Sequence, residues 1–415
     1  MNSLVLGVFV LVYVGMALGR LPWLALDRTG VAMLGAIALL AGGALTTQEA
    51  WLAIDVPTMA MLFGLMVVSA QLRLGGFYTR VTRSIASAEL PPQGLLALVI
   101  AASAVLSALL ANDIICLAMT PILVEGCRDR GLNPMPFLLA LACASNIGSA
   151  ATLIGNPQNM LIGQVTGLPF TAYLLDAAVP VAASLLALWA IVCAKHRHSW
   201  RAAVTPAFVA PVQAPVFNAW QTGKGLFFLG LLMAAFLAGR PPREVAALAC
   251  AGVLLLSRKL TSRDKFALVD WQLLLLFIGL FVVNHALAAT GLLERVHDAM
   301  ARGGVDLGNG GWLFVVTAAL SNIVSNVPAV MLLLPKAMAP EAALVLALSS
   351  TLAGNLLLVG SIANLIVADQ AERHGVRMTW GAHLRVGLPV TLASFALAGA
   401  WLWLRWGAHF VARQP

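Results

Sequence analysis

Charged residues are scarce in this chain: Asp, Glu, Lys and Arg make up 10% of its 415 residues, whereas 60% are hydrophobic. Soluble domains carry about 25% charged residues, so this composition excludes a water-soluble fold. Apolar runs recur from Leu4 to Phe410, and many are long enough to cross a hydrocarbon core of about 30 Å. The sequence therefore predicts an all-α polytopic protein of the bacterial inner membrane.

Cysteine is also rare, and the motifs of common enzymes are missing. The five cysteines are odd in number and scattered through apolar runs, which indicates neither a disulfide framework nor a metal cluster. The sequence contains no P-loop and no H-E-x-x-H pattern, so nucleotide hydrolysis and zinc peptidase chemistry have no candidate residues. We expect no enzyme activity and no cofactor other than a coupling ion.

The net charge of +8 does not indicate a nucleic-acid partner. In a membrane protein, the position of Lys and Arg along the chain reports orientation instead. We expect the partners to be membrane lipid and a small solute.

The chain contains an internal duplication. Three pairs of segments match in the same order: 51–69 with 266–284, 106–121 with 320–335, and 155–159 with 360–364. The matches align Asp55 with Asp270 and Asn112 with Asn326. Three ordered matches favour two structural repeats over chance similarity of apolar sequence.

Each half divides into the same parts: three spans, an apolar segment with a polar centre, a long run interrupted by Gly, Pro and Asn, and a final span. The predicted boundaries are a first repeat at 1–194 with its hairpin at 94–125, broken helix at 135–166 and last span at 171–194; a basic, Pro-rich cytoplasmic linker at 195–222; and a second repeat at 223–415 with its hairpin at 311–335, broken helix at 340–370 and last span at 383–408.

The basic residues decide how the polar-centred segments cross the membrane. If both segments enter and return as re-entrant hairpins, most of the 25 Lys and Arg residues fall on one side. If both cross fully, the basic residues divide almost evenly, which contradicts the positive-inside rule. We therefore predict about 10 transmembrane helices, two re-entrant hairpins and two discontinuous helices, with inverted repeats and both termini in the periplasm.

The interrupted segments are the candidate binding site. Irregular backbone at membrane depth survives only where it is buried in protein or lines a cavity, and secondary carriers place their sites at such breaks. Freed backbone amides at a helix N-terminus favour an anion, whereas carbonyl groups at a C-terminus favour Na⁺. The candidate residues are Asn112, Asp113, Ser145, Asn146, Gly148, Thr152, Gly155, Asn156, Asn159, Ser325, Asn326, Thr351, Asn355, Gly360, Ser361 and Asn364.

Within this set we predict a Na⁺ site near Asn112, Asp113, Gly148 and Asn326. An alternative stays open for the small residues, because Gly and Ser also let helices pack closely in lipid.

Asp113 is an ionisable residue inside an apolar run, which makes it a functional candidate by default. It could bind a cation, carry a proton, or cap the turn of the hairpin. Asp55 and Asp270 stand at the starts of spans, and we interpret them as structural interfacial residues.

The segments ANDIICLAMTP, SNIGSAATLIGNPQN, SNVPAV and GSIANLIV carry a family resemblance. The sequence resembles the ion transporter superfamily, which includes citrate and divalent-anion symporters, arsenite pump membrane subunits and NhaD-like sodium/proton antiporters. The resemblance covers essentially the whole chain. It implies a homodimer in which two transport regions move against scaffold regions by an elevator mechanism.

The hairpin tips depart from the pattern of the dicarboxylate carriers in that superfamily. Those carriers have Ser-Asn-Thr motifs at both tips, where this chain has 111–113 (Ala-Asn-Asp) and 325–327 (Ser-Asn-Val). Only the asparagines are kept in both tips. This departure weighs against a dicarboxylate substrate and against two conventional sodium sites.

Three functions follow as hypotheses. The first is a secondary active transporter of a small anion, coupled to Na⁺ or H⁺. The second is an efflux permease for arsenite or antimonite, and the third is a Na⁺/H⁺ antiporter that uses Asp113. The sequence leaves open the solute, the coupling ion, the direction of transport and a partner ATPase encoded elsewhere.

Overall fold

The computed structural model describes residues 2–19, 25–201 and 215–411, with side chains up to residue 407. Part of the predicted linker, residues 202–214, lies outside the described residues, as do Met1 and 412–415. The described chain consists of helices joined by turns and loops, and an isolated bridge joins Leu132 to Arg201.

The helices of the first half are α1 (Asn2–Leu18), α2 (Arg28–Ala41), α3 (Thr47–Ala53), α4 (Val56–Leu74), α5 (Phe77–Ala86), α6 (Pro92–Leu109), α7 (Asn112–Asp129), α8 (Pro134–Ser149), α9 (Pro157–Val165) and α10 (Phe170–His196). Those of the second half are α11 (Ala219–Ala238), α12 (Arg243–Leu255), α13 (Ser262–Phe266), α14 (Trp271–Ala289), α15 (Leu292–Arg302), α16 (Gly310–Val324), α17 (Asn326–Leu333), η1 (Leu334–Lys336), α18 (Pro340–Ala353), η2 (Leu358–Gly360), α19 (Ile362–Arg373) and α20 (Trp380–Val411).

The α-helix order of the second half repeats that of the first, and the helix starts match in detail. Asp55 caps α4 by accepting from the Thr58 amide at 2.8 Å, and Asp270 caps α14 by accepting from the Leu273 amide at 2.9 Å. Helices α3 and α13 both begin with a capping box, and α5 and α15 both begin after a left-handed glycine. The duplication inferred from the sequence is therefore visible in the local structure that caps each helix.

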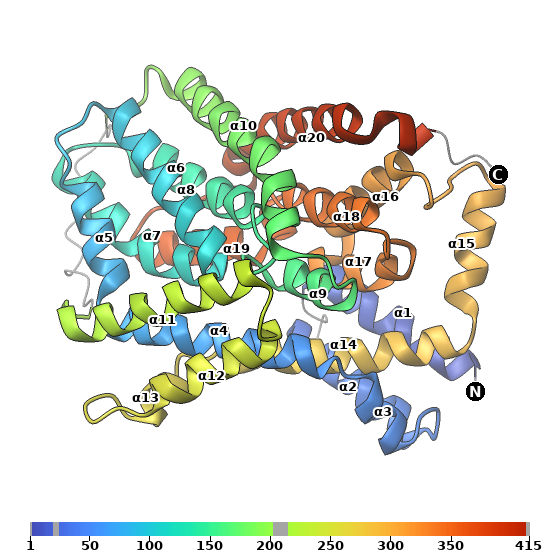
Figure 1. Cartoon of the computed structure of the whole chain (residues 1–415). Helices are drawn as coiled ribbons and strands as arrows, with labels where there is room; N and C mark the ends of the chain where they lie inside the picture. Colours follow the sequence, from blue (N-terminus) through green and yellow to red (C-terminus); the bar gives the residue numbers. More distant parts are fainter. Residues whose placement is uncertain (1, 20–24, 202–214, 412–415) are drawn as a thin grey trace.

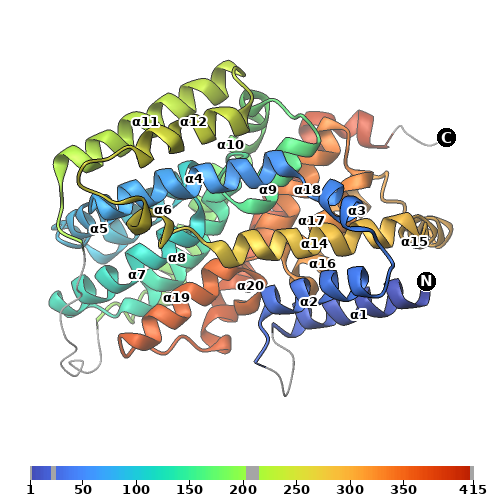
Figure 2. The same cartoon turned by 90° about the horizontal axis from the view of Figure 1, so that it is seen from below.

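Two layers make up the molecule in Figure 1, with the horizontal helices α4, α11, α12 and α14 along one side and the hairpins and broken helices along the other. Seen from below in Figure 2, α11 and α12 lie beside α4, while α1 and α2 lie beside α14. Helix α4 of the first repeat thus packs on α11 and α12 of the second, and α14 of the second repeat packs on α1 and α2 of the first. This exchange is what two inverted repeats around a pseudo-two-fold axis produce.

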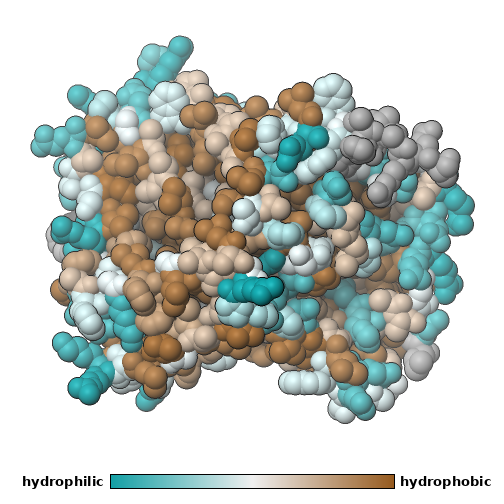
Figure 3. Space-filling view, in the orientation of Figure 1, coloured by the Kyte–Doolittle hydropathy of each residue, from teal (hydrophilic) through white to brown (hydrophobic). Residues whose placement is uncertain are grey.

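In the part of the chain that the structure describes, six helices are long and apolar enough to cross a membrane, namely α4, α6, α10, α11, α14 and α20. The same part contains five shorter apolar helices, α1, α2, α8, α16 and α18. Hydrophobic residues cover much of the face in Figure 3, and hydrophilic residues are most frequent at its left and right edges. The predicted all-α polytopic fold is confirmed.

Each repeat contains one pair of helices joined by a tight turn and one interrupted helix. Helix α6 turns into α7 through Leu110 and Ala111, and α16 turns into α17 at Ser325. Ser325 has a φ of 76°, the only positive φ of a non-glycine residue among those described. The break between α8 and α9 spans residues 150–156, and that between α18 and α19 spans 354–361.

Candidate functional site

After each break, the second half of the broken helix begins at a polar residue that caps it. Asn156 caps α9, where its side-chain oxygen accepts from the Asn159 amide at 2.9 Å. Ser361 caps α19, where its hydroxyl accepts from the Ala363 amide at 3.2 Å. The caps satisfy amides that would otherwise be unpaired at membrane depth.

The backbone carbonyls freed by the breaks are bonded by one asparagine in each repeat. The Asn159 Nδ2 donates to the Thr152 carbonyl at 3.1 Å, and the Asn364 Nδ2 donates to the carbonyls of Leu357 at 3.2 Å and Gly354 at 2.7 Å. Both asparagines are fully buried. The breaks are therefore held in shape by side-chain amides.

The two broken helices are hydrogen-bonded to each other across the repeats. The Asn146 Nδ2 donates to the Asn364 Oδ1 and to the Asn355 Oδ1, both at 3.0 Å. The Asn146 Oδ1 accepts from the Ser361 hydroxyl at 2.8 Å. Asn146 thus joins the end of α8 to the second break and to α19. The predicted site residues that take part in the whole network are Asn112, Asn146, Asn156, Asn159, Thr351, Asn355, Ser361 and Asn364.

The tip of the first hairpin docks onto this network through Asn112. Its backbone amide donates to the Gly155 carbonyl at 3.2 Å, and its Nδ2 donates to the Asn146 Oδ1 at 3.2 Å. Ser145 lies next to the network, with its hydroxyl 3.0 Å from the Cys116 Sγ. The hairpin tip and both broken helices consequently form one polar centre.

The three predicted glycines lie where chains approach closely. A Cβ on Gly148 would stand 2.3 Å from the Ala104 Cα, and one on Gly155 would stand 2.3 Å from the Ser149 carbonyl. A Cβ on Gly360 would stand 3.1 Å from the Asn322 Oδ1. Thr152 also lies at a close contact between chain segments, since its hydroxyl donates to the Ala108 carbonyl of α6 at 2.5 Å. Close packing accounts for Gly148 and Gly155 without a ligand.

Three polar atoms at the second hairpin and the second break lack partners among the described residues. The Oδ1 atoms of Asn322 and Asn326 and the Nδ2 of Asn355 are buried, and no described group hydrogen-bonds to them. Asn326 lies beside the second break, because a Cβ on Gly354 would stand 3.3 Å from its Nδ2. Buried polar groups are normally bonded, so these three atoms have free hydrogen-bonding capacity for a solute or ion.

Asp113 lies outside the hydrogen-bonded network. It lines a cavity of about 210 Å³ together with Arg73 of α4 and Asp270 at the start of α14. No side chain caps α7, so the capping role considered for Asp113 is not the one observed. The four residues predicted around a Na⁺ thus lie in different surroundings, and the Na⁺ site stays a prediction.

Sequence reasoning missed several residues of the centre. The Gln158 Nε2 donates to the Thr351 hydroxyl at 3.3 Å, and the Tyr173 hydroxyl donates to the Ala150 carbonyl at 2.8 Å. The buried His383 of α20 lies with its Nε2 3.0 Å from the Asn355 carbonyl oxygen. Gln158 stood within the GNPQN motif and could have been found, whereas the other two come from distant helices with no local signal.

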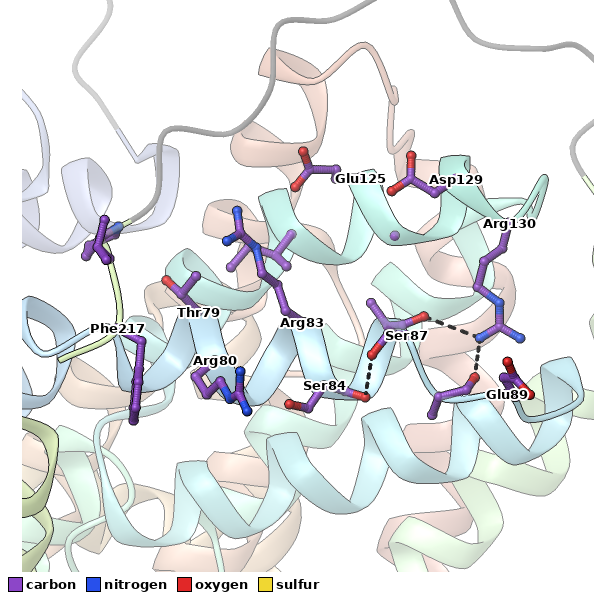
Figure 4. Close-up of a pocket in the computed structure, with 16 residues that line it drawn as sticks. Thr79, Arg80, Arg83, Ser84, Ser87, Glu89, Glu125, Asp129, Arg130 and Phe217 are labelled. Atoms are coloured by element: carbon purple, nitrogen blue, oxygen red, sulfur yellow. Dashed lines mark hydrogen bonds between the residues drawn. The ribbon is translucent and has the colours of Figure 1, made fainter. Parts of the chain in front are cut away.

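A wider cavity of about 1140 Å³ lies between α5 and α7, away from the polar centre (Figure 4). Arg80, Arg83 and Arg130 line it together with Glu125 and Asp129. The Arg130 guanidinium donates to the carbonyls of residues 88 and 90, both at 2.7 Å. These charged residues at helix ends are typical of a hydrated surface of a membrane protein.

Paired helical hairpins, interlocked broken helices and a buried polar centre are typical of multi-pass membrane transporters. The sequence profile of the citrate transporter family matches residues 10–345. The chain belongs to the citrate transporter family, within the superfamily that its motifs resemble.

Relatives of similar length agree with this assignment. An uncharacterized transporter of Mycobacterium tuberculosis is 30% identical over 98% of this chain and 99% of the relative. The silicon efflux transporter LSI3 of Oryza sativa subsp. japonica is 28% identical over 96% of each chain. The inner membrane protein YbiR of Escherichia coli is 30% identical over 78% of this chain and 81% of its own length.

Among solved structures, the chain is similar to the YdaH transporter of Alcanivorax borkumensis, whose crystal structure is described as having an unusual topology. The TM-score is 0.58 at 18% identity, over 98% of both chains. At this identity the similarity supports the fold alone.

Proposed function

We propose that this chain is a secondary active transporter of a small anion, coupled to Na⁺ or H⁺. The observation that carries the proposal is the arrangement of helix starts. Helices α7, α9, α17 and α19 all begin at the polar centre, at residues 112, 157, 326 and 362. Each helix N-terminus carries a partial positive charge from its backbone amides, and such ends bind anions in broken-helix carriers.

The side chains at the centre complement this backbone charge. They are amides and hydroxyls, and within the described residues no Lys or Arg side chain hydrogen-bonds to them. An anion would therefore be held by helix ends and neutral donors without a fixed positive side chain. The family's description as citrate transporters supports an oxygen-rich anion.

An elevator movement is the mechanism that we propose for this transport. The hydrogen bonds from Asn146 to Asn364 and from Asn112 to Asn146 tie a hairpin tip and both broken helices together. Parts joined in this way would move as one body against α4 and α14. The low-dielectric surroundings favour keeping such a network intact during movement.

A second candidate is the efflux of a small neutral hydroxide such as arsenite, antimonite or silicic acid. The uncharged lining of the centre favours it, because hydroxyl groups bind amides and hydroxyls without needing a positive charge. The similarity to a silicon efflux transporter also supports it. A Na⁺/H⁺ exchange by Asp113 without any solute is the third candidate.

We also propose the membrane location, orientation and oligomeric state of the transporter. The distribution of the 25 Lys and Arg residues supports a bacterial inner-membrane location with both termini in the periplasm. The family resemblance supports a homodimer, and a partner ATPase is left open. Neither a nucleic acid nor a catalytic activity is part of the proposal.

A thermal-stability screen of the purified protein tests the proposed function. Citrate, succinate, phosphate, sulfate, chloride, arsenite and silicic acid are each added in Na⁺ buffer and in Na⁺-free buffer. A ligand present at 100 times its Kd stabilises the native state by about 2.7 kcal/mol, which raises the melting temperature. Stabilisation by an anion supports the first candidate, and stabilisation by arsenite or silicic acid alone replaces it with the second.

If Na⁺ alone stabilises the protein and no solute adds to its effect, cation exchange replaces both candidates. Transport of the stabilising solute into proteoliposomes is then measured with and without an ion gradient. If the solute only reaches equal concentrations inside and outside the proteoliposomes under every ion gradient, secondary active transport is contradicted.

A further inference from the structure

The start of α12 holds the end of α9 through side-chain hydrogen bonds. Arg243, the first residue of α12, donates from its guanidinium to the Gly163 carbonyl at 3.0 Å and to the Leu168 carbonyl. Glu244, the next residue, accepts from the Gln164 Nε2 at 2.8 Å. Helix α9 is half of a broken helix and belongs to the side that we propose to move, whereas α12 packs on α4 of the other side. These hydrogen bonds therefore cross the boundary along which an elevator would slide.

The sequence at the end of α9 leaves room for this contact. A Cβ on Gly163 would stand 2.9 Å from the Arg243 Nη1, so a larger residue at this position would push the guanidinium aside. Phe170 of α10 and Phe236 of α11 line the same cavity, of about 540 Å³, and their ring centroids are 5.7 Å apart. Helix α10 packs on α8 and α20, and α11 packs on α4. The contact thus combines three side-chain hydrogen bonds with a buried aromatic pair that also joins the two sides.

The other repeat has an equivalent helix start. Arg28 and Thr29 begin α2 as Arg243 and Glu244 begin α12. The two pairs are as far apart in the sequence as the first pair of matched segments in the duplication. The arginine is therefore common to both repeats, whereas a threonine stands in the place of the glutamate.

The start of α2 is hydrogen-bonded within its own side of the molecule. The Arg28 Nε donates to the Met16 carbonyl of α1 at 3.2 Å, and the Thr29 hydroxyl donates to the Gln272 carbonyl of α14 at 3.2 Å. Helices α1 and α2 both pack on α14. Within the described residues, neither side chain hydrogen-bonds to α19. Equivalent helix starts thus have different partners in the two repeats.

The end of α19 is exposed, whereas the end of α9 is held. Asp369 stands at the position of Gln164, and its carboxylate pairs with Arg373 of the same helix at 2.9 Å, with 55% of the Asp369 side chain exposed. The start of α2 lies beside the start of α19 instead, since Arg28 and Ile362 line one cavity of about 290 Å³. Helices α9 and α19 both begin at the polar centre. The polar centre is therefore closer to the start of α2 than to the start of α12.

Inverted repeats can exchange their arrangements, because their backbones are equivalent. After such an exchange the end of α19 would lie at the start of α2, and the end of α9 would be released. The groups on the two sides of this second contact are complementary. Arg28 would donate to carbonyl groups at the end of α19, and the Thr29 hydroxyl would donate to the Asp369 carboxylate. The second bond would take the place of the one between Gln164 and Glu244.

We propose that Arg243 and Glu244 form a latch that stabilises the state seen here, and that Arg28 and Thr29 form a second latch that engages the end of α19 in the opposite state. The inference rests on the proposed function, because it requires the elevator movement. In the proposed orientation the first latch is periplasmic, and the polar centre of the state seen here lies towards the cytoplasm. The four latch residues are half-buried, so water can replace the hydrogen bonds that are broken in each exchange.

Reversible cross-linking of the full chain in proteoliposomes tests this inference. Gln164→Cys with Glu244→Cys reports the first latch, and Thr29→Cys with Asp369→Cys reports the second. A reducible bifunctional thiol reagent is added without solute, and mass spectrometry identifies linked peptides that are absent from the parent protein with its five native cysteines. Both pairs should be cross-linked, since the protein exchanges between the two states. Gln164→Cys with Asp369→Cys is the matched control and should not be cross-linked, because α9 and α19 run from the centre to opposite sides in the proposed topology.

Breaking the first latch should shift the equilibrium towards the second. Gln164→Ala and Glu244→Ala remove the same hydrogen bond, so each should raise the initial rate of cross-linking between Thr29→Cys and Asp369→Cys about fivefold, the equilibrium effect of one hydrogen bond. The two substitutions together should do no more than either alone. Ser84→Ala, at an exposed position of α5, is the control and should leave the rate unchanged. No cross-link of the second pair in any variant, or an unchanged rate in both latch variants, would overturn the proposal.

Transport measurements separate this inference from the function on which it rests. The cross-linked Gln164→Cys/Glu244→Cys protein should transport none of the stabilising solute, and reduction of the cross-link should restore transport. If wild-type protein transports no solute of the panel, the proposed function fails, while the cross-linking result on the two latches stands. If the cross-linked protein transports the solute at the wild-type rate, the latch is overturned and the proposed function stands.

Discussion

Asn146 and Thr351 occupy equivalent positions near the ends of α8 and α18, and each bonds to the other repeat. The Asn146 Nδ2 donates to the Asn364 Oδ1 at 3.0 Å, and the Thr351 hydroxyl donates to the Asn159 Oδ1 at 3.4 Å. Asn159 and Asn364 are themselves equivalent, since each holds the break of its own helix. The two broken helices are therefore interlocked by reciprocal contacts, and one repeat without the other would leave these groups unpaired.

Removing Asn146 should destabilise the protein more than removing the hydroxyl of Thr351. Asn146→Ala strips partners from Asn112, Asn355 and Asn364 at once, and each buried group left unsatisfied costs about 1–3 kcal/mol. Thr351→Val keeps the shape of the side chain and loses weaker contacts. Thermal unfolding in detergent should rank the melting temperatures as wild type, Thr351→Val and Asn146→Ala. Equal values for the two variants would contradict the central role of Asn146.

Two equivalent glycines should be intolerant of a single added methyl group. A Cβ on Gly64 would stand 2.7 Å from the Ala247 backbone, and one on Gly279 would stand 2.7 Å from the Ala32 backbone. Gly64→Ala and Gly279→Ala should each cost about 1–3 kcal/mol of stability, because the packed helices must separate. Gly252→Ala is the control, since nothing lies within 4 Å of its added Cβ. Wild-type melting temperatures for Gly64→Ala and Gly279→Ala would show that the helix pairs adapt.

Loss of the Asn326 side chain should weaken ligand binding without a large effect on the empty protein. The Asn326 Oδ1 has no partner, so Asn326→Ala breaks no hydrogen bond that the described structure contains. The melting temperature without ligand should stay close to wild type, while the rise caused by the stabilising solute or by Na⁺ should shrink. Gln370→Ala, outside the polar centre, should retain the full rise. A full rise in Asn326→Ala would remove this residue from the site.

Equivalent helix ends should face opposite sides of the membrane. Ser87 ends α5 and Gly303 ends α15, and both positions are exposed. Inverted repeats would place Gly303 in the periplasm and Ser87 in the cytoplasm. In whole cells, a membrane-impermeant maleimide should therefore label Gly303→Cys and leave Ser87→Cys unlabelled. In permeabilised cells the maleimide should label both variants. Labelling of the parent protein, which has the five native cysteines, is subtracted as background. Labelling of both variants in intact cells would contradict the inverted topology.

The sequence alone determined the class of the fold, the two repeats and the places where helices break. These features are local: apolar length, the Gly, Pro and Asn of the breaks, and the capping residues Asp55 and Asp270 act over one or two helical turns. That the hairpins are re-entrant stays a prediction, which rests on the distribution of Lys and Arg along the whole chain. The polar residues of the centre could also be named, since donors and acceptors inside apolar runs are rare.

Only the tertiary structure decided which of these residues meet. Asn146 and Asn364 are hydrogen-bonded although more than half the chain separates them, and no periodic pattern encodes such a contact. Asp270 was interpreted as a structural interfacial residue; the structure shows that it caps α14, and folding also places it in one cavity with Arg73 and Asp113. Contacts of this kind arise from the packing of one repeat on the other, so the local sequence around each residue does not contain them.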